Sequence, residues 1–240
     1  MGYEKVSIDI GIRSARPEQP EAGKAAPTSP ARLLLVRHGQ STWNHEHRIQ
    51  GQLDPPLSDE GRRQAAHLGR RLAGRSFSGF YSSDLKRALE TAVAIGRSVG
   101  LEPTPMAELR EIFLGEWEGL LTEDLATRFP QAWAGWVEEP DWDLVPGGEG
   151  SAAFEARVKA ALDSLFAAHP IGDVLVVTHG GVIQIALHHV VGRPGHGIFP
   201  FRIQNTSMSV IEKRNGRLVV SGVNDISHLE PETAGGLEIG

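Results

Sequence analysis

Short apolar runs alternate with longer amphipathic stretches along most of the chain. Five stretches are predicted to be strands: 33–36, 80–82, 174–177, 202–213 and 218–223. The first and the third are wholly apolar, which is typical of strands that are covered on both faces of a sheet. The last two flank Asn215-Gly216, a dipeptide that favours a tight hairpin turn.

Between the strands, cap residues, glycine stops and apolar faces indicate helices. Five stretches are predicted to be helical: 58–72, about 84–99, 122–129, 152–168 and 181–190. Serine or aspartate precedes three of them as a candidate N-terminal cap: Ser58, Ser83 or Asp84, and Ser151. Gly100 and Gly192 are expected to end two of the helices. Residues 131–150 are rich in tryptophan, turn residues and acids, and we expect them to form a covering loop.

This order of strands and helices predicts an α/β fold, namely a three-layer α/β/α sandwich with a mostly parallel mixed sheet. The C-terminal antiparallel hairpin is expected to close one edge, and the regular domain is expected to span 32–240. Residues 1–31 are interpreted as an N-terminal extension. The composition of 14–30 is typical of a flexible segment, whereas the alternation of apolar and polar residues over 6–12 would suit an added edge strand.

Composition removes several classes of function. The formal net charge of −6 argues against a nucleic-acid-binding protein, which would normally carry a basic field. The chain has no cysteine, so disulfides, thiolate metal sites and cysteine nucleophiles are excluded. No apolar run approaches the ~20 residues that span a bilayer, and no secretory signal is visible, so we expect a cytoplasmic protein.

Two strand ends in the chain match each other. The apolar runs at 33–36 and 174–177 both lead to a histidine followed by glycine, His38 after the first run and His179 after the second. In an open α/β sheet, ligands bind outside the carboxyl ends of the strands, so neighbouring strands would place both imidazoles in one crevice. A pair of hydrogen-bonded structural histidines and a zinc site are the alternatives, although nearby arginines would repel a cation.

Arginines accompany these histidines. Arg37 directly precedes His38, and Arg87 lies just inside a helix that follows a strand. A guanidinium group matches phosphate oxygens two at a time, and helix N-termini favour anions. The pattern therefore indicates a phosphate site, with a solvated helix charge as the alternative interpretation of Arg87.

At these residues the chain resembles the histidine phosphatase superfamily, also called the phosphoglycerate-mutase-like family. Arg-His-Gly alone would be a weak signal, but the similar segments follow the family's order between 32 and 223. They are 35–44 (LVRHGQSTWN), 50–54 (QGQLD), 57–61 (LSDEG), 82–88 (SSDLKRA), 109–119 (LREIFLGEWEG) and 178–181 (THGG). One departure is Gly150, where the family's Gly-Gly-Glu-Ser pattern has serine. The absence of this serine is expected to affect helix capping more than catalysis.

The resemblance implies a role for each matching residue. His38 is implied to be the nucleophile, Glu111 the proton donor, and His179 a further catalytic residue beside the phosphate. The implied phosphate-binding groups are Arg37, Arg87, Asn44, Ser41 and the backbone N–H of Gly180. The implied substrate-pocket residues are Trp43, Gln50, Gly51, Trp117 and Asn205.

Several of these residues have a second interpretation. Glu111 could instead form a surface ion pair with Arg110, and Trp43 and Trp117 could simply be core residues. The tryptophans of the segment 131–150 could form a lid over the substrate or could pack that segment onto the domain. We also expect His179 to be cationic when it faces a phosphate dianion.

The implied activity is that of a phosphoric monoester hydrolase of the histidine acid phosphatase type. It would hydrolyse a small phosphorylated metabolite through a phosphohistidine intermediate, with no metal and no cofactor, and with neither nucleic acid nor membrane as a partner. A cofactor-dependent phosphoglycerate mutase is the alternative, disfavoured because residues 120–149 hold one cation, Arg128, against an excess of acids. A catalytically silent phosphate-binding or interaction module is the second alternative. The natural substrate and any homo-oligomer stay open.

Overall fold

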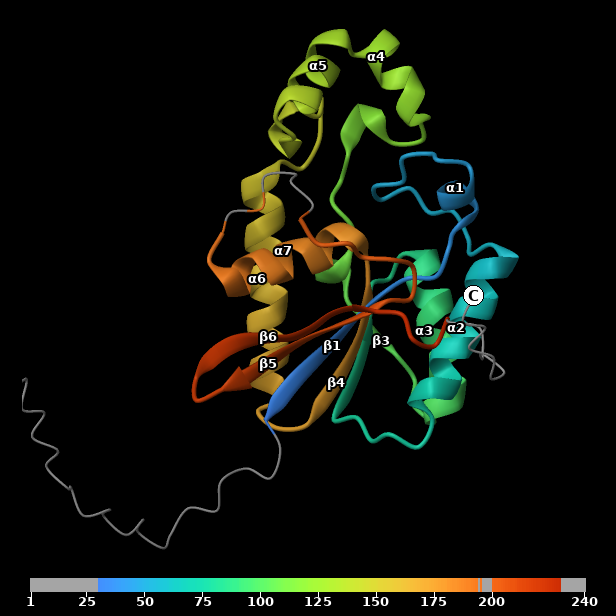
Figure 1. The fold of residues 1–240 in the computed structure, drawn as a ribbon, viewed down its shortest axis with the longest axis vertical. Helices are drawn as coiled ribbons and strands as arrows, with labels where there is room; N and C mark the ends of the chain where they lie inside the picture. Colours follow the sequence, from blue (N-terminus) through green and yellow to red (C-terminus); the bar gives the residue numbers. More distant parts are fainter. Residues whose placement is uncertain (1–29, 194, 196–199, 230–240) are drawn as a thin grey trace, which may run out of the picture.

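The computed structural model describes residues 30–193, 195 and 200–229. The two interpretations of the N-terminal extension therefore fall on residues that lie outside the described part of the chain. Figure 1 shows a central sheet with helices on both of its faces. The predicted α/β/α sandwich is thus confirmed.

Within the described residues, one sheet has the strand order β3-β2-β4-β1-β5-β6. The strands are β1 (Ala31–Arg37), β2 (Gly79–Ser82), β3 (Thr104–Pro105), β4 (Asp173–Thr178), β5 (Met208–Arg214) and β6 (Arg217–Asp225). The first four strands of that order run parallel, and β5 and β6 are antiparallel. In the β1–β4 pair, Leu33 lies opposite Val174 and Arg37 opposite Thr178, so the two strands end level with each other.

Helices cover both faces of this sheet. On one face lie α2 (Asp59–Leu72) and α3 (Lys86–Val99), and on the other lie α6 (Ser151–Ala168) and α7 (Gly180–Val191). The shorter helices α1 (Thr42–His45), α4 (Leu125–Arg128) and α5 (Pro130–Glu138) lie beyond the end of the sheet (Figure 1). Each face of the sheet carries an apolar core, and the residues of β1 point alternately into one core and the other. Leu34 and Val36 pack with α2 and α3, whereas Leu33 and Leu35 pack with α6 and α7. No helix within the described ranges is both long and apolar enough to cross a bilayer.

The prediction of a covering loop at 131–150 was wrong for its first half, which is helical, whereas 139–141 and 145–150 are irregular. Helix α5 begins at Pro130, a residue that suits the first turn of a helix because its missing N–H has no partner there. One face of α5 packs Trp133 and Trp136 against the ring of Trp117, and a short 3₁₀ turn follows at Trp142–Leu144. Tertiary packing of the tryptophans stabilises a helix that the turn residues and acids of this segment obscured.

The boundary of the fourth predicted strand was also wrong at its start. Residues 202–207 are not part of β5, which begins at Met208. Thr206 has a positive φ of 55°, and its N–H donates to the carbonyl of Arg37 at 3.0 Å. The chain is bent toward the end of β1 here. The hairpin prediction is confirmed, since Asn215 and Gly216 both have positive φ and β5 pairs with β6.

Cap predictions had a mixed outcome. Ser58 caps α2 by accepting the N–H of Gly61 at 3.1 Å, and Gly100 and Gly192 end α3 and α7 in the left-handed conformation. For α3 the predicted caps were wrong, because the N-cap is Leu85 and it forms no side-chain cap hydrogen bond.

The Ser151 cap was wrong as well. Ser151 is the first residue of α6, and Gly150 is the N-cap, with a φ of 76° that disfavours side chains. The backbone N–H of Ser151 donates to a carboxylate oxygen of Asp143 at 2.7 Å. A carboxylate from the preceding 3₁₀ turn therefore supplies the cap that serine supplies in the related pattern.

Candidate active site

The level ends of β1 and β4 bring the two predicted histidines together. The ring centroids of His38 and His179 lie 5.2 Å apart, with an angle of 59° between the ring planes. Both side chains are buried, at 3% and 0% exposure. Parallel pairing of two apolar strands thus places two imidazoles at one edge of the sheet, as the matching strand ends indicated.

Hydrogen bonds determine the tautomer of His38. Its Nδ1 lies 2.7 Å from the carbonyl oxygen of Gly39, which can only accept, so Nδ1 carries the proton. Its Nε2 lies 3.3 Å from Nε of Arg87, which can only donate, so Nε2 presents a lone pair. His38 is therefore a neutral imidazole whose Nε2 is available as a nucleophile.

Arg87 is a buried cation held by loop carbonyls. Its Nη1 donates to the carbonyl of Leu53 at 2.8 Å and its Nη2 donates to the carbonyl of Gly51 at 2.7 Å. The residue is 1% exposed, and burial lowers its pKa to about 10, so it stays protonated at neutral pH. Within the described structure no carboxylate lies at hydrogen-bond distance from this guanidinium. A buried cation without such a partner would strongly stabilise an anion bound at the site.

Arg37 and His179 complete the cluster. Nη1 of Arg37 donates to the carbonyl of Ile203 at 2.7 Å, while its buried Nε has no hydrogen-bond partner among the described residues. Nε2 of His179 lies 2.8 Å from the hydroxyl of Ser83, and its buried Nδ1 is likewise without a partner in the described part of the chain. Buried polar atoms are usually satisfied, so each of these two atoms retains its capacity for a hydrogen bond to a further partner, such as water or an anion.

Burial and the nearby guanidinium groups hold both imidazoles neutral. Burial lowers the pKa of His38 well below its usual value, and the charges of Arg87 and Arg37 lower it further. Burial, followed by the charge of Arg87, has the same effect on the pKa of His179. The expected cationic His179 would therefore require the opposing charge of a bound phosphate dianion.

The free energy of unfolding is therefore expected to fall as the pH drops below about 6.5. His38 and His179 bind protons in the unfolded chain but not in the folded protein, so each lowers that free energy by ~1.4 kcal/mol per pH unit. His228, whose pKa burial lowers to about 4, acts in the same direction. Denaturant unfolding between about pH 7 and pH 5 measures this slope, and a flat profile would contradict a neutral buried pair.

Glu111 reaches the cluster from the segment that follows β3. Its Oε1 accepts the N–H of Ile112 at 3.0 Å, and its Oε2 accepts the N–H of Gly181 at 3.1 Å, at the start of α7. The alternative ion pair with Arg110 is not formed, because Arg110 donates to Asp84 at 2.7 Å. The carboxyl group is thus held at the wall of the site and not at the protein surface.

Four of these residues, Arg37, His38, Arg87 and Glu111, line a cavity of about 220 Å³, whereas His179 lies behind its wall against His38. The lining residues of the cavity are Arg37, His38, Ile49, Gln50, Gly51, Arg87, Glu111, Ile112, Leu114, Trp142 and Gly181. The sequence did not predict the apolar side of this cavity, which is formed by Ile49, Ile112, Leu114 and Trp142. Its members lie in segments without strong periodicity, and of these the sequence singles out Trp142 alone, as a residue of either a lid or a packed segment.

Other predicted site residues support the cavity without lining it. Ser41 caps α1 and forms a capping box with Asn44, and its hydroxyl lies 2.7 Å from the side-chain oxygen of Gln50. Nδ2 of Asn205 donates to the backbone carbonyl of His38 at 3.0 Å. These bonds fix the loop and the nucleophile in place, and direct phosphate contact by Ser41, Asn44 and Gly180 stays a prediction.

The tryptophans divide between core and cavity. Trp117 is 3% exposed and lies edge-on to Trp133 and Trp136, which favours the packing interpretation for these three rings. Trp142 lines the cavity and lies edge-on to Phe154, with ring centroids 5.3 Å apart. Trp43 does not line the cavity; Arg48 stacks on its ring.

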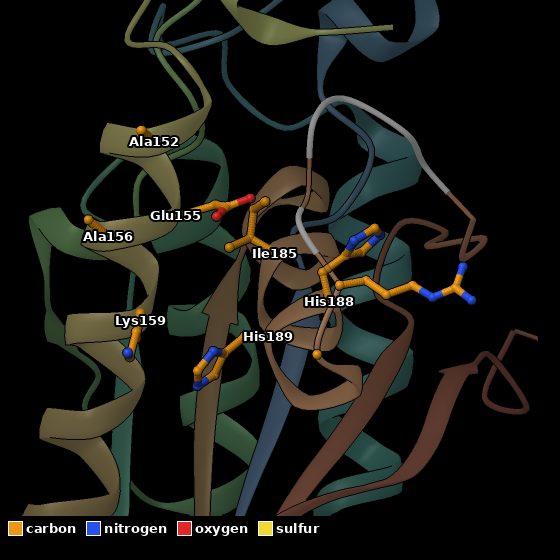
Figure 2. A pocket seen from close by; sticks show the side chains of 9 residues that line it. Ala152, Glu155, Ala156, Lys159, Ile185, His188 and His189 are labelled. Atoms are coloured by element: carbon orange, nitrogen blue, oxygen red, sulfur yellow. The ribbon is translucent and has the colours of Figure 1, made fainter. Parts of the chain in front are cut away.

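A larger hollow of about 520 Å³ lies elsewhere, between α6 and the end of α7 (Figure 2). Glu155, Lys159, His188 and His189 are among its lining residues. None of the clustered strand-end residues contributes to it. The candidate active site is therefore identified by its chemistry and not by its size.

Fold and site together define an α/β protein with a buried anion site built from two histidines and two arginines. The chain belongs to the histidine phosphatase superfamily (branch 1), whose family profile matches residues 33–226. The predicted family membership is thereby confirmed.

Named relatives agree with this assignment. The chain is 35% identical over 198 residues to phosphoserine phosphatase 1 of Hydrogenobacter thermophilus, covering 82% of this chain and 94% of the relative. It is 37% identical over 204 residues to phosphoglycerate mutase-like protein 4 of Arabidopsis thaliana, covering 83% and 87%. Among solved structures, Bacillus stearothermophilus YhfR matches with a TM-score of 0.77 and 33% identity, covering 83% of this chain and 100% of that chain.

Proposed function

We propose that this protein is a metal-independent phosphatase that hydrolyses small phosphorylated metabolites through a phosphohistidine on His38. The observation that carries the proposal is the buried, neutral His38, whose unprotonated Nε2 lies beside Arg87 in a cavity that Arg37 also lines. Membership of the superfamily and the relative named phosphoserine phosphatase support a phosphoric monoester hydrolase. A cavity of about 220 Å³, below the usual size of drug-sized sites, suits a small substrate.

In the first step, Nε2 of His38 forms a bond to phosphorus while the bond from phosphorus to the leaving oxygen breaks. The guanidinium groups of Arg37 and Arg87 balance the charge on the equatorial oxygens. Glu111, in its protonated form, donates its proton to the leaving oxygen. The alcohol departs, and the phosphoryl group stays on the imidazole.

In the second step, water takes the place of the alcohol. Glu111, now ionised, accepts a proton from water as the new bond from oxygen to phosphorus forms. The bond from phosphorus to Nε2 breaks, inorganic phosphate is released, and His38 returns to its neutral form. A protonated His179 would add a donor to the phosphate oxygens in both steps.

Transfer back to the substrate, as in a mutase, is the competing outcome, and one relative bears a phosphoglycerate mutase-like name. A mutase has to keep water away from the phosphohistidine and bind a substrate carboxylate. The segment 120–149 offers one cation, Arg128, whose guanidinium lies over the ring of Phe129. This composition favours hydrolysis. For the compartment we propose the cytoplasm.

Release of inorganic phosphate from p-nitrophenyl phosphate in the presence of a chelator tests this function. We expect full turnover with the chelator and no gain from added divalent metal. Incubation of 3-phosphoglycerate with 2,3-bisphosphoglycerate should yield inorganic phosphate and little isomerised product. Dependence on a divalent metal, or no turnover of any phosphomonoester, would contradict the proposal.

Substitution of Gly181 tests the placement of Glu111. A Cβ added at Gly181 would lie 2.3 Å from Oε1 of Glu111, so the carboxyl group of Glu111 has to move. We expect Gly181→Ala to lower kcat/KM for a phosphomonoester by about 10- to 100-fold. Gly222→Ala is the control, because an added Cβ there meets nothing within 4 Å. Equal kcat/KM values for the two variants would show that the observed position of Glu111 is not required.

A further inference from the structure

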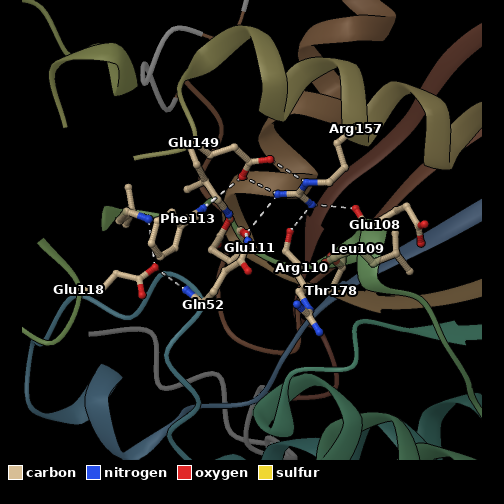
Figure 3. A network of polar contacts seen from close by, with 12 residues as sticks. Gln52, Glu108, Leu109, Arg110, Glu111, Phe113, Glu118, Glu149, Arg157 and Thr178 are labelled. Carbon is tan, nitrogen blue, oxygen red and sulfur yellow. Dashed lines mark hydrogen bonds and ion pairs between the residues drawn. The ribbon is translucent and has the colours of Figure 1, made fainter. Parts of the chain in front are cut away.

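The segment that carries Glu111 has little regular structure of its own. A single 3₁₀ turn, Ala107–Leu109, precedes it, and the next turn begins only at Gly115. Irregular backbone near a buried site needs other hydrogen-bond partners for its N–H and C=O groups. In this protein, side chains from distant parts of the chain supply them (Figure 3).

Arg157 of α6 is the centre of that network. Its Nη1 donates to the carbonyls of Glu108 and Arg110 at 2.9 and 2.8 Å, and its Nη2 donates to the carbonyl of Glu111 at 3.2 Å. Its Nε and Nη2 also donate to the two carboxylate oxygens of Glu149, at 2.8 and 2.7 Å. A guanidinium group has five N–H donors, and all five are used here.

Glu149 extends the same network to the far end of the segment. Its Oε2 also accepts the N–H of Phe113 at 3.2 Å, and its own N–H donates to the carbonyl of Phe113 at 2.9 Å. The side chains of Arg157 and Glu149 are 20% and 16% exposed, so solvent only partly screens the ion pair. The pair therefore fixes the backbone both before and after Glu111.

Gln52 holds the same residue from the loop whose carbonyls bind Arg87. Its Nε2 donates to the carbonyl of Glu111 at 3.1 Å, so that carbonyl accepts from Arg157 and Gln52 together. The N–H of Gln52 in turn donates to Glu118, which also accepts the N–H of Leu114. The loop that holds Arg87 and the segment that carries Glu111 are thereby joined.

We propose that Arg157 is a positioning residue for proton transfer, which acts with Glu149 and Gln52 to hold the Glu111 carboxyl group at the leaving oxygen. The proposal rests on the proposed phosphatase function. Arg157 does not line the cavity, and its hydrogen bonds reach the site through the backbone of Glu111 and its neighbours. Its replacement should therefore weaken protonation of the leaving group more than attack by His38.

Two esters of similar shape separate these effects. Phenyl phosphate releases phenoxide, which is basic enough to gain from protonation, whereas p-nitrophenyl phosphate releases the more stable nitrophenolate anion. Arg157→Lys keeps the charge but loses the planar five-donor geometry. We expect its kcat/KM for phenyl phosphate to fall by about 10- to 100-fold, and for p-nitrophenyl phosphate by less than about 3-fold.

Chemical rescue adds a readout that a purely structural role would not move. In Arg157→Ala, millimolar guanidinium ion should restore kcat/KM for phenyl phosphate, and methylammonium should not, since it lacks the planar donor array. Arg75→Lys is the matched control, because Arg75 pairs with Asp173 at 2.8 Å, at the opposite end of the parallel strands. It should leave the ratio between the two esters unchanged.

Equal loss on both esters in Arg157→Lys, or no loss on either, would overturn the proposal. If Arg157→Lys does not fold, Gln52→Met removes the second donor to the same carbonyl and must show the same selective loss. Wild-type protein that cleaves neither ester would overturn the proposed function and this proposal together. Wild-type protein that cleaves both, with equal losses in the variants, would remove only the positioning role.

Discussion

Replacement of His38 by alanine is expected to lower kcat for a phosphomonoester by at least about 10⁴-fold, because no group then remains to accept the phosphoryl group. The unprotonated Nε2 of His38 accepts a hydrogen bond from the buried guanidinium of Arg87 at 3.3 Å. Water could still attack the substrate within the cationic cavity, which would leave a small residual rate. Steady-state release of inorganic phosphate measures the loss.

His189→Ala is the matched control, since His189 is exposed on α7 and does not line the cavity. Thermal unfolding should show that both variants are folded, although His38→Ala removes a buried side chain. Near-wild-type turnover by folded His38→Ala would remove His38 as the nucleophile.

Glu111→Gln is expected to lower kcat/KM for phenyl phosphate by about 10²- to 10⁴-fold, because an amide cannot donate a proton to the leaving oxygen. For p-nitrophenyl phosphate the loss in kcat/KM should be much smaller, since nitrophenolate leaves without a proton. The second step still lacks its base. The variant should therefore release a burst of about one nitrophenolate per active site, followed by slow turnover.

The same substitution has a structural cost. The Glu111 carboxylate accepts the N–H groups of both Ile112 and Gly181, and an amide offers a single acceptor oxygen. One of these N–H groups loses its partner, which is expected to cost about 1–3 kcal/mol in the free energy of unfolding. Glu108→Gln, an exposed neighbour, is the control. Equal losses of kcat/KM on both esters would remove Glu111 as the general acid.

The part of the site that could be predicted depends on local sequence. The apolar runs before His38 and His179 specify buried parallel strands, and parallel strands bring their carboxyl ends to one edge of the sheet. Both histidines and Arg87 could therefore be assigned to one anion site from the sequence alone. Helix α2, with a serine cap and an apolar stripe, was predictable for the same reason.

Other contacts could not be predicted because they join residues that are far apart in the sequence. Ser83 and Asp84 both look like caps for α3, yet Ser83 bonds His179 and Asp84 bonds Arg110, partners 96 and 26 residues away. No local sequence pattern specifies whether such a side chain caps the helix or bonds to a distant residue. The choice is made by the tertiary structure, which here favours the site over the helix end.

Arg157 illustrates the same limit. In the sequence it is one more cation on an amphipathic helix, and such residues usually lie in solvent. Its three carbonyl partners lie 46 to 49 residues before it, in a segment whose lack of periodicity gave no sign of where its backbone groups would be satisfied.

Rapid quenching of the wild-type protein with a phosphate-labelled substrate tests the central claim most directly. We expect an acid-labile, alkali-stable label on the protein that maps by peptide mass analysis to His38. Continued turnover with the label on another residue, or with no labelled protein at any time point, would contradict it.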